Sequence, residues 1–161
     1  MQKDHVDLVL EQWQQQRPDL DVSPMAIFGR LSRMNSMVEP KIKAVLKSYG
    51  LTIAEFDVLA ALKRGGEPLT PTTLYNTTML TSGAMTARLD KLEQRGFIKR
   101  LPSATDRRSL LIALTEKGLE LVDTAVNAHV ENERQMLACF SEDEIKQLAS
   151  LMKTWLLAHE K

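Results

Sequence analysis

The sequence predicts a mainly α-helical fold with one small β-hairpin. Apolar residues recur with the 3.6-residue period of a helix along most of the 161 residues. The period changes to the two-residue alternation of a strand in two short segments, 97–101 and 109–114. The residues between them, 102–108, are polar and rich in turn formers, so we expect the two strands to form a hairpin.

Two helices are predicted in the N-terminal third. Apolar residues at i, i+3, i+4 and i+7 predict a helix over residues 4–16. Pro18 ends this segment, because proline disfavours helical backbone in the residue before it. Ser23 and Pro24 form a start signal, a capping residue followed by proline in the first turn, for a long helix that stops at Gly50.

Three helices and the hairpin make up the centre of the chain. Thr52 caps the first helix, Thr70 and Pro71 open the second, and the third spans residues 82–95. Three helices followed by a strand, a polar tip and a second strand are typical of a winged helix-turn-helix domain, which we place at 51–118.

Helical arms flank this domain on both sides. Thr115 caps a long helix, and a capping box at 141–144 starts the last one. The arms, 1–50 and 119–161, carry apolar stripes that a small winged domain does not need to close its core. We therefore expect residues 1–161 to form one protomer, whose arms act as dimerisation helices in a two-fold dimer.

The composition excludes several classes of protein. Apolar residues make up 43% and charged residues 26% of the chain, and no apolar run approaches the ~18 residues that span a membrane. The polar N-terminus does not resemble a signal peptide, and a single cysteine fits a reducing compartment. We therefore expect a cytoplasmic protein with no membrane partner, no metal and no cofactor. The apolar neighbours of Cys139 predict a buried thiol.

The positive charge of the chain is concentrated in its centre. The whole chain holds 21 basic and 21 acidic residues, so its net charge is zero. Residues 61–114 nevertheless hold nine lysines or arginines against four acidic residues. A basic centre in an otherwise acidic chain indicates a polyanion such as double-stranded DNA, and hence a location with the nucleoid. The alternative is a chance clustering of solvated charges.

Two surfaces of the predicted domain are suited to DNA. The face of the 82–95 helix opposite its apolar stripe combines hydroxyl residues, which permit close approach, with an arginine for a guanine edge and a lysine for phosphate. The hairpin tip adds two arginines suited to the narrow minor groove and an aspartate that we expect to orient the tip. The predicted DNA-binding residues are Ser82, Thr86, Arg88, Lys91, Asp106, Arg107 and Arg108.

The central residues 51–118 resemble the MarR family of winged-helix regulators. Residues 85–98 are similar to the family's recognition helix and first wing strand. Residues 105–109, with Asp-Arg-Arg at their centre, and the Leu-Thr-Glu-Lys-Gly of 114–118 are similar to its wing signature. The resemblance implies a homodimer that binds a palindromic operator, usually as a repressor, and a small ligand that loosens this binding.

A narrower resemblance concerns the ligand. The N-terminal helix with Trp13, residues 17–21 and residues 54–59 resemble the urate-responsive branch of the family. That branch places a tryptophan, an aspartate and an arginine around its ligand, and Trp13, Asp57 and Arg64 occupy these positions. The resemblance implies a small effector such as urate.

The chemistry of these residues fits a planar anion. Asp57 and Arg64 are two helical turns apart, so they share one face of their helix, about 10 Å apart. Trp13 can donate its indole N–H to an anionic purine and stack on its ring. Arg17 is a weaker candidate for the same site. The alternatives are another small aromatic anion, or no ligand, with Trp13 as a core anchor and the charges as surface groups.

The sequence thus predicts a ligand-responsive DNA-binding regulator rather than an enzyme, for which no catalytic set of residues is present. The alternative from another class is a dimeric protein–protein adaptor that kept the winged fold without binding DNA. The basic recognition face and the Asp-Arg-Arg tip argue against the adaptor.

Overall fold

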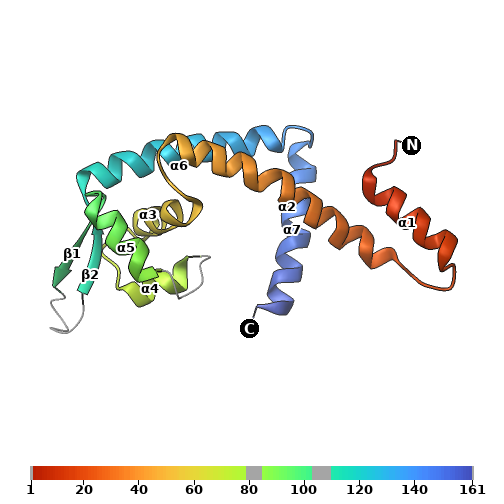
Figure 1. Cartoon of the computed structure of the whole chain (residues 1–161), viewed down its shortest axis with the longest axis horizontal. Helices are drawn as coiled ribbons and strands as arrows, with labels where there is room; N and C mark the ends of the chain where they lie inside the picture. The colour runs from red at the N-terminus through yellow and green to blue at the C-terminus, as the bar shows by residue number, and fades with distance from the viewer. Residues whose placement is uncertain (1, 79–84, 103–109, 161) are drawn as a thin grey trace. The chain divides into compact units, whose positions relative to one another are not determined.

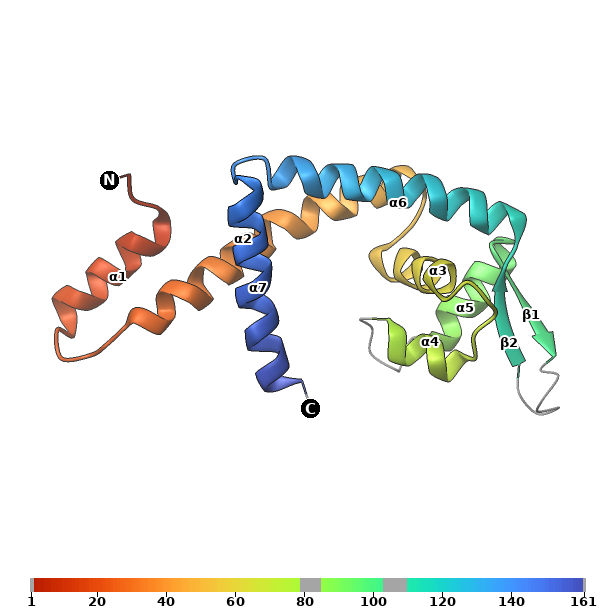
Figure 2. The same ribbon diagram turned by 180° about the vertical axis from the view of Figure 1, so that it is seen from behind.

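The computed structural model describes residues 2–78, 85–102 and 110–160. Within these ranges the fold is mainly helical with one antiparallel hairpin, as predicted (Figure 1 and Figure 2). In chain order the elements are α1 (His5–Gln16), α2 (Ser23–Ser48), α3 (Ile53–Gly65), α4 (Pro71–Thr77), α5 (Met85–Gln94), β1 (Ile98–Pro102), β2 (Leu110–Leu114), α6 (Glu116–Met136) and α7 (Glu142–His159).

Packing divides the chain into two compact units, Met1–Lys41 and Ile42–Lys161, with the boundary inside α2. In the first unit, α1 lies against the N-terminal part of α2. Val6 is the buried residue of α1, and it packs on Gly29, where an added Cβ would lie 3.2 Å from a Val6 methyl group.

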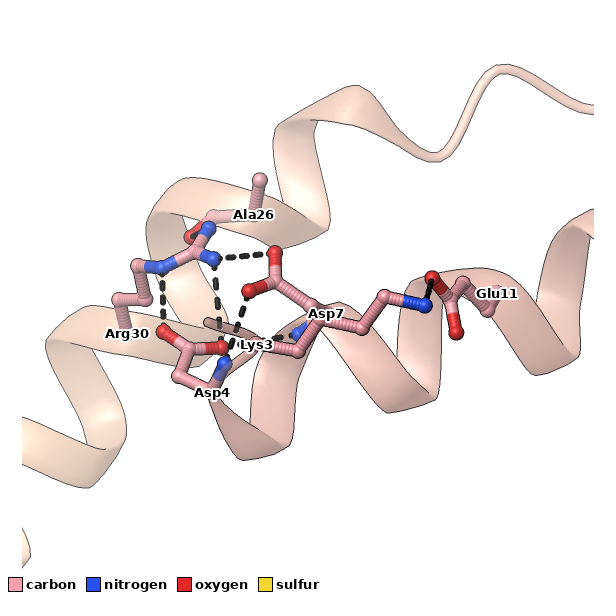
Figure 3. A network of polar contacts seen from close by, with 6 residues as sticks. All are labelled: Lys3, Asp4, Asp7, Glu11, Ala26 and Arg30. Atoms are coloured by element: carbon pink, nitrogen blue, oxygen red, sulfur yellow. Dashed lines mark hydrogen bonds and ion pairs between the residues drawn. The ribbon is translucent and has the colours of Figure 1, made fainter. Parts of the chain in front are cut away.

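An ion-pair cluster also holds α1 to α2 (Figure 3). The guanidinium of Arg30 donates from Nε to Asp4 at 2.8 Å and from Nη2 to Asp7 at 2.6 Å. The same two aspartates form the capping box at the start of α1. Arg30 therefore binds the helix start through the residues that cap it.

The start of α2 differs from the prediction. Ser23 is the first helical residue rather than the capping residue. The carboxylate of Asp21 instead accepts hydrogen bonds from the backbone N–H of Ser23 at 2.9 Å and from its hydroxyl at 3.1 Å. An aspartate side chain can reach an amide two residues further along the chain, and here it takes over the role predicted for serine.

In the second unit, hydrogen-bonding side chains start the helices where the sequence predicts them. Thr52, Thr70, Thr115 and Ser141 each accept a hydrogen bond from the backbone N–H three residues later. Glu144 completes the predicted capping box at Ser141. Each cap satisfies an amide that the first turn leaves unpaired, which fixes where the helix begins.

One hydrophobic core holds the second unit together. Both views show α3, α4, α5 and the hairpin on one side of α6 (Figure 1 and Figure 2). Among the helices of this unit, α3 has the largest fraction of buried residues. The side chains that meet in this core with almost no exposed surface include Leu46, Leu59, Leu74, Leu89, Leu92, Ile98, Ile112 and Val122.

The hairpin is tied to its surroundings by the backbone. β1 and β2 pair with Ile98 opposite Leu114. Leu69, just before α4, exchanges two backbone hydrogen bonds with Ile112 at 3.0 and 2.8 Å, a pairing that the sequence did not predict. The sheet thereby fixes the start of α4 as well as the hairpin.

The apolar stripes of the flanking helices are open to solvent in the single chain. In α2, Ile27 is 67% exposed and Phe28 is 55% exposed. In α7, Leu151 and Leu157 are 63% and 70% exposed, and α7 buries none of its residues. No helix in the described ranges is both long and apolar enough to cross a bilayer.

The prediction of a buried thiol at Cys139 is wrong, because the side chain is exposed. α6 ends at Met136 rather than near Ala138, so Cys139 lies in the connection that precedes α7. Its apolar neighbours in sequence do not enclose it in this turn.

Candidate nucleic-acid interface

The polar face of α5 is the centre of the candidate interface. Met85, Leu89 and Leu92 are buried against the core, so the helix presents its other side. Thr86 and Lys91, two of the predicted DNA-binding residues, are exposed there. Helix α5 follows the short helix α4, which is the order of elements in a helix-turn-helix.

Arg88 lies at the edge of this face. It is partly buried, and its Nη1 atom is buried without a hydrogen-bond partner in the described part of the chain. The reason is its place in the helix, three residues after Met85 and four before Leu92, beside the apolar stripe. A buried unpaired N–H costs free energy, so an acceptor on DNA would suit this guanidinium better than its present surroundings.

A buried carboxylate from α3 holds two cations, one on α5 and one directly after its last residue. The Glu55 side chain is only 4% exposed, and its Oε1 lies 2.9 Å from Lys91 Nζ and 3.3 Å from Arg95 Nη1. Its Oε2 accepts from the backbone N–H of Thr52 at 2.8 Å. Burial raises the pKa of Glu55, but the hydrogen bonds from Thr52 and the Lys91 ammonium outweigh this and hold the pKa below its ordinary value.

A cation from β1 holds the carboxylates of α5. Arg100 Nη2 donates to Asp90 at 2.6 Å, and Nη1 pairs with Glu93. The hydrogen bond to Asp90 raises the pKa of Arg100, and burial opposes it. The candidate recognition helix is thus tied to α3 through Lys91 and the adjoining Arg95, and to the hairpin through Asp90 and Glu93.

The remaining predicted DNA-binding residues, Ser82, Asp106, Arg107 and Arg108, lie outside the described residues. The described part of the hairpin ends at Pro102 and Leu110, which pair with each other across the sheet.

The predicted ligand residues belong to different units. Trp13 lies in α1 and is 39% exposed, and Arg17 follows α1 as its C-cap residue. Arg17 forms a two-bonded fork with Asp19, at 2.9 and 2.8 Å, and this hydrogen bonding raises the pKa of Arg17. The charge of Arg17 is therefore already neutralised by Asp19 within the first unit.

Asp57 and Arg64 lie on α3 in the second unit. Arg64 is exposed and donates from Nη2 to the backbone carbonyl of Thr77 at 3.4 Å. Thr77 is the last residue of α4, so Arg64 links the end of α3 to the helix-turn-helix. The grouping of these residues with Trp13 in one pocket stays a prediction.

None of the predicted ligand residues lines the two hollows described next, which lie in the described parts of the chain. A groove of about 470 Å³ in the second unit lies between α3, the hairpin and α6, with Lys63, Lys99 and Leu119 among its walls. A smaller one of about 360 Å³ in the first unit runs from Leu10 to Ser23.

Sequence reasoning missed the residues that position α5. Glu55 carries a readable signal, because a glutamate three residues after a capping threonine is a capping box. Nothing in the sequence indicates that the same carboxylate would meet Arg95, 40 residues away, or that Arg100 would reach back to α5.

Comparisons with known proteins agree with this architecture. The family model described as MarR family matches residues 49–109. The chain is 42% identical to the HTH-type transcriptional regulator PecS of Dickeya dadantii, over 89% of this chain and 88% of that protein. It is 31% identical to the HTH-type transcriptional regulator MhqR of Bacillus subtilis, over 80% of this chain and 88% of that protein.

Solved structures share the fold. The ligand-free crystal structure of wild-type MarR from E. coli matches with a TM-score of 0.67 and 28% identity, over 80% of this chain and 96% of that one. The organohalide-sensing regulator RdhR, solved with 2,4-dichlorophenol bound, matches with a TM-score of 0.77 and 19% identity, over 89% and 85% of the two chains. The chain therefore belongs to the MarR family of winged-helix transcriptional regulators, which bind DNA and are not enzymes.

Proposed function

We propose that this chain is a homodimeric repressor that binds a palindromic operator and is released by a small aromatic anion such as urate. The observation that carries the DNA-binding part is the polar face of α5, which is open to solvent and held from both sides by ion pairs. A helix that is fixed before binding loses less entropy when it enters a groove.

In this proposal the recognition helix reads the major groove through Ser82, Thr86 and Arg88, and Lys91 contacts phosphate. Arg107 and Arg108 enter the minor groove, and Asp106 orients them. For a two-fold reader, the half-site centres lie about 34 Å apart, one turn of DNA. Regulation takes place in the cytoplasm, on the nucleoid.

The exposed apolar faces of α2 and α7 support the dimer. Ile27, Phe28, Leu151 and Leu157 are each more than half exposed, and surfaces of this kind on a soluble chain mark interaction sites. A second copy offers the same two faces and so covers them symmetrically.

The effector site is proposed on Trp13, Asp57 and Arg64, with Arg17 as a secondary member because Asp19 already pairs with it. The contact of Arg64 with the Thr77 carbonyl supports a route from effector to DNA. An anion that competes for Arg64 would remove a contact between α3 and α4, and α4 precedes the recognition helix. A phenol bound to RdhR shows that a structure with this fold can hold a small aromatic ligand.

The test is fluorescence anisotropy of a labelled duplex from upstream of the chain's own gene, titrated with protein at several salt concentrations, with and without urate. Tight, salt-sensitive binding that urate releases is the expected result. Tight binding that urate leaves unchanged would keep the regulator and reject the urate site. A flat titration would reject the operator and favour the adaptor.

A further inference from the structure

The two cations that Glu55 holds are not equivalent. Arg95 is 30% exposed and has other partners: Nη2 donates to the Gly50 carbonyl at 2.8 Å, and its guanidinium lies 4.7 Å from the centre of the Phe97 ring. Lys91 is 59% exposed, and in the described part of the chain Glu55 is its one ion-pair partner. Arg95 is thus fixed in place, while Lys91 reaches Glu55 from the solvent side.

This difference decides which cation can leave. Removing the last partner of a buried carboxylate is costly, because an uncompensated charge stays behind. With Arg95 in place, Glu55 keeps one guanidinium and its hydrogen bonds from Thr52 when Lys91 departs. The ammonium of Lys91 can therefore exchange Glu55 for another anion at small cost.

We propose that Glu55 is an internal competitor of DNA phosphate for Lys91, and that it lowers the affinity of the protein for non-specific DNA. The inference rests on the proposed function, in which α5 lies on DNA. Non-specific binding depends almost entirely on phosphate contacts, so a lysine that is occupied by Glu55 weakens it directly.

The test is a double-mutant cycle with Glu55→Gln and Lys91→Met, measured by anisotropy on a random-sequence duplex and on the operator. Glutamine keeps an oxygen for the Thr52 N–H and removes the charge. We expect Glu55→Gln to tighten binding to the random duplex by about two- to fivefold, the range for an ion pair whose lysine is open to solvent. In the Lys91→Met background the same change should have almost no effect. Lys91→Met alone should make the salt slope shallower by about 0.9.

The cycle distinguishes the exchange of Lys91 between Glu55 and phosphate from a general effect of removing a negative charge. It also distinguishes failure of this inference from failure of the proposed function. An equal gain from Glu55→Gln in both backgrounds would show only the removal of a negative charge and would overturn the inference. A loss of affinity in a variant with wild-type thermal stability would also overturn it. A wild-type protein that binds no duplex would instead refute the proposed function.

A measurement on the wild-type protein covers the case in which Glu55→Gln does not fold. Lysines are labelled by reductive methylation with ¹³C, and the Lys91 signal is assigned by its loss in Lys91→Met. Addition of the random duplex should shift this signal as the amine leaves Glu55 for phosphate. A Lys91 signal that stays in place in a saturated complex contradicts the exchange.

Discussion

Glu55 performs two tasks with one carboxylate. Its Oε2 completes the capping box with Thr52 at the start of α3, and its Oε1 receives Lys91 from α5 and Arg95, the residue after α5. The first task is local and the second joins two helices. A neutral residue of the same size could cap α3 but could not hold the two cations.

The acid dependence of stability should report on Glu55. Its pKa is lower in the folded protein than the ordinary 4.5, so its contribution to stability is full above about pH 4.5 and is lost as the pH falls through the folded pKa. Glu55→Gln should therefore flatten this part of the profile, measured by urea unfolding between pH 3 and pH 7. The control Glu131→Gln, at an exposed ion pair of α6, should keep the wild-type profile.

Arg64 should affect the effector response more than DNA binding. Arg64→Ala removes the contact with the Thr77 carbonyl and the proposed anion contact, but no predicted DNA contact. We expect operator affinity within about twofold of wild type and a blunted release by urate, both read by anisotropy. Lys63→Ala, which breaks the neighbouring ion pair with Asp123, is the matched control. Release of DNA at the wild-type urate concentration would exclude Arg64 from the effector site.

Gly118 is a residue at which one methyl group should be costly. An added Cβ would lie 1.9 Å from the carbonyl oxygen of Phe97, a backbone atom that cannot rotate away. Gly118→Ala should therefore lower the free energy of unfolding by about 1–3 kcal/mol, or more if the hairpin moves. Urea unfolding checks this, with the exposed Glu120→Ala on the same helix as a control that stays within about 0.5 kcal/mol. An unchanged Gly118→Ala would mean that α6 and β1 separate easily.

At the scale of single elements, α1 depends on a few contacts. It has 12 residues and buries only Val6, and isolated helices of this length are marginal in water. The Arg30 cluster supplies the polar part of its docking (Figure 3). The helix that carries Trp13 therefore has Val6 as its one buried side chain and Arg30 as a partner for its first turn.

Hydrogen–deuterium exchange of α1 should show this dependence. Arg30→Gln removes the charged bonds to Asp4 and Asp7, and because these pairs are partly exposed their loss should have a modest effect. The amides of α1 should exchange about fivefold faster, while those of α6 stay unchanged. Arg33→Gln, three residues along α2, should leave α1 as it is. Equal exchange in wild type and Arg30→Gln would show that the cluster does not dock the helix.

The predicted elements match the structure closely where their signals are local. Apolar periods and caps depend on residues within one turn of each other, so α3, α6 and α7 begin where Thr52, Thr115 and Ser141 predict. The sequence prediction failed at one local choice between two neighbouring polar residues and at one contact between distant residues. Asp21 replaced Ser23 at the start of α2, and Leu69 joined the sheet through Ile112.

At the scale of the whole molecule, the solvent-exposed apolar faces of α2 and α7 indicate an interaction with another chain. Exposed side chains such as Ile27, Leu151 and Leu157 leave the single chain incomplete. The proposed dimer covers these faces and also provides the two recognition helices that a palindrome requires.

Charges placed in these faces should weaken the dimer. Ile27→Glu and Leu157→Glu each put an unpaired carboxylate in the proposed interface, where desolvation is costly, so the dimer dissociation constant should rise at least about tenfold. Sedimentation equilibrium measures this constant. Leu110→Glu, at an exposed leucine of β2, should leave it unchanged. Dimers that persist in both variants would place the interface elsewhere.

The sequence alone determined the order of the elements, the winged-helix class and the family, because these depend on local periodicity, caps and short motifs such as Leu114–Gly118. In the sequence, Gly118 is only one residue of a motif. The structure gives the reason for a glycine there, because a Cβ would collide with the carbonyl of Phe97. Tertiary structure decided which charges are free for a ligand. Lys91, Arg95 and Arg100 look alike in the sequence, but their carboxylate partners come from other elements, and only folding brings them together.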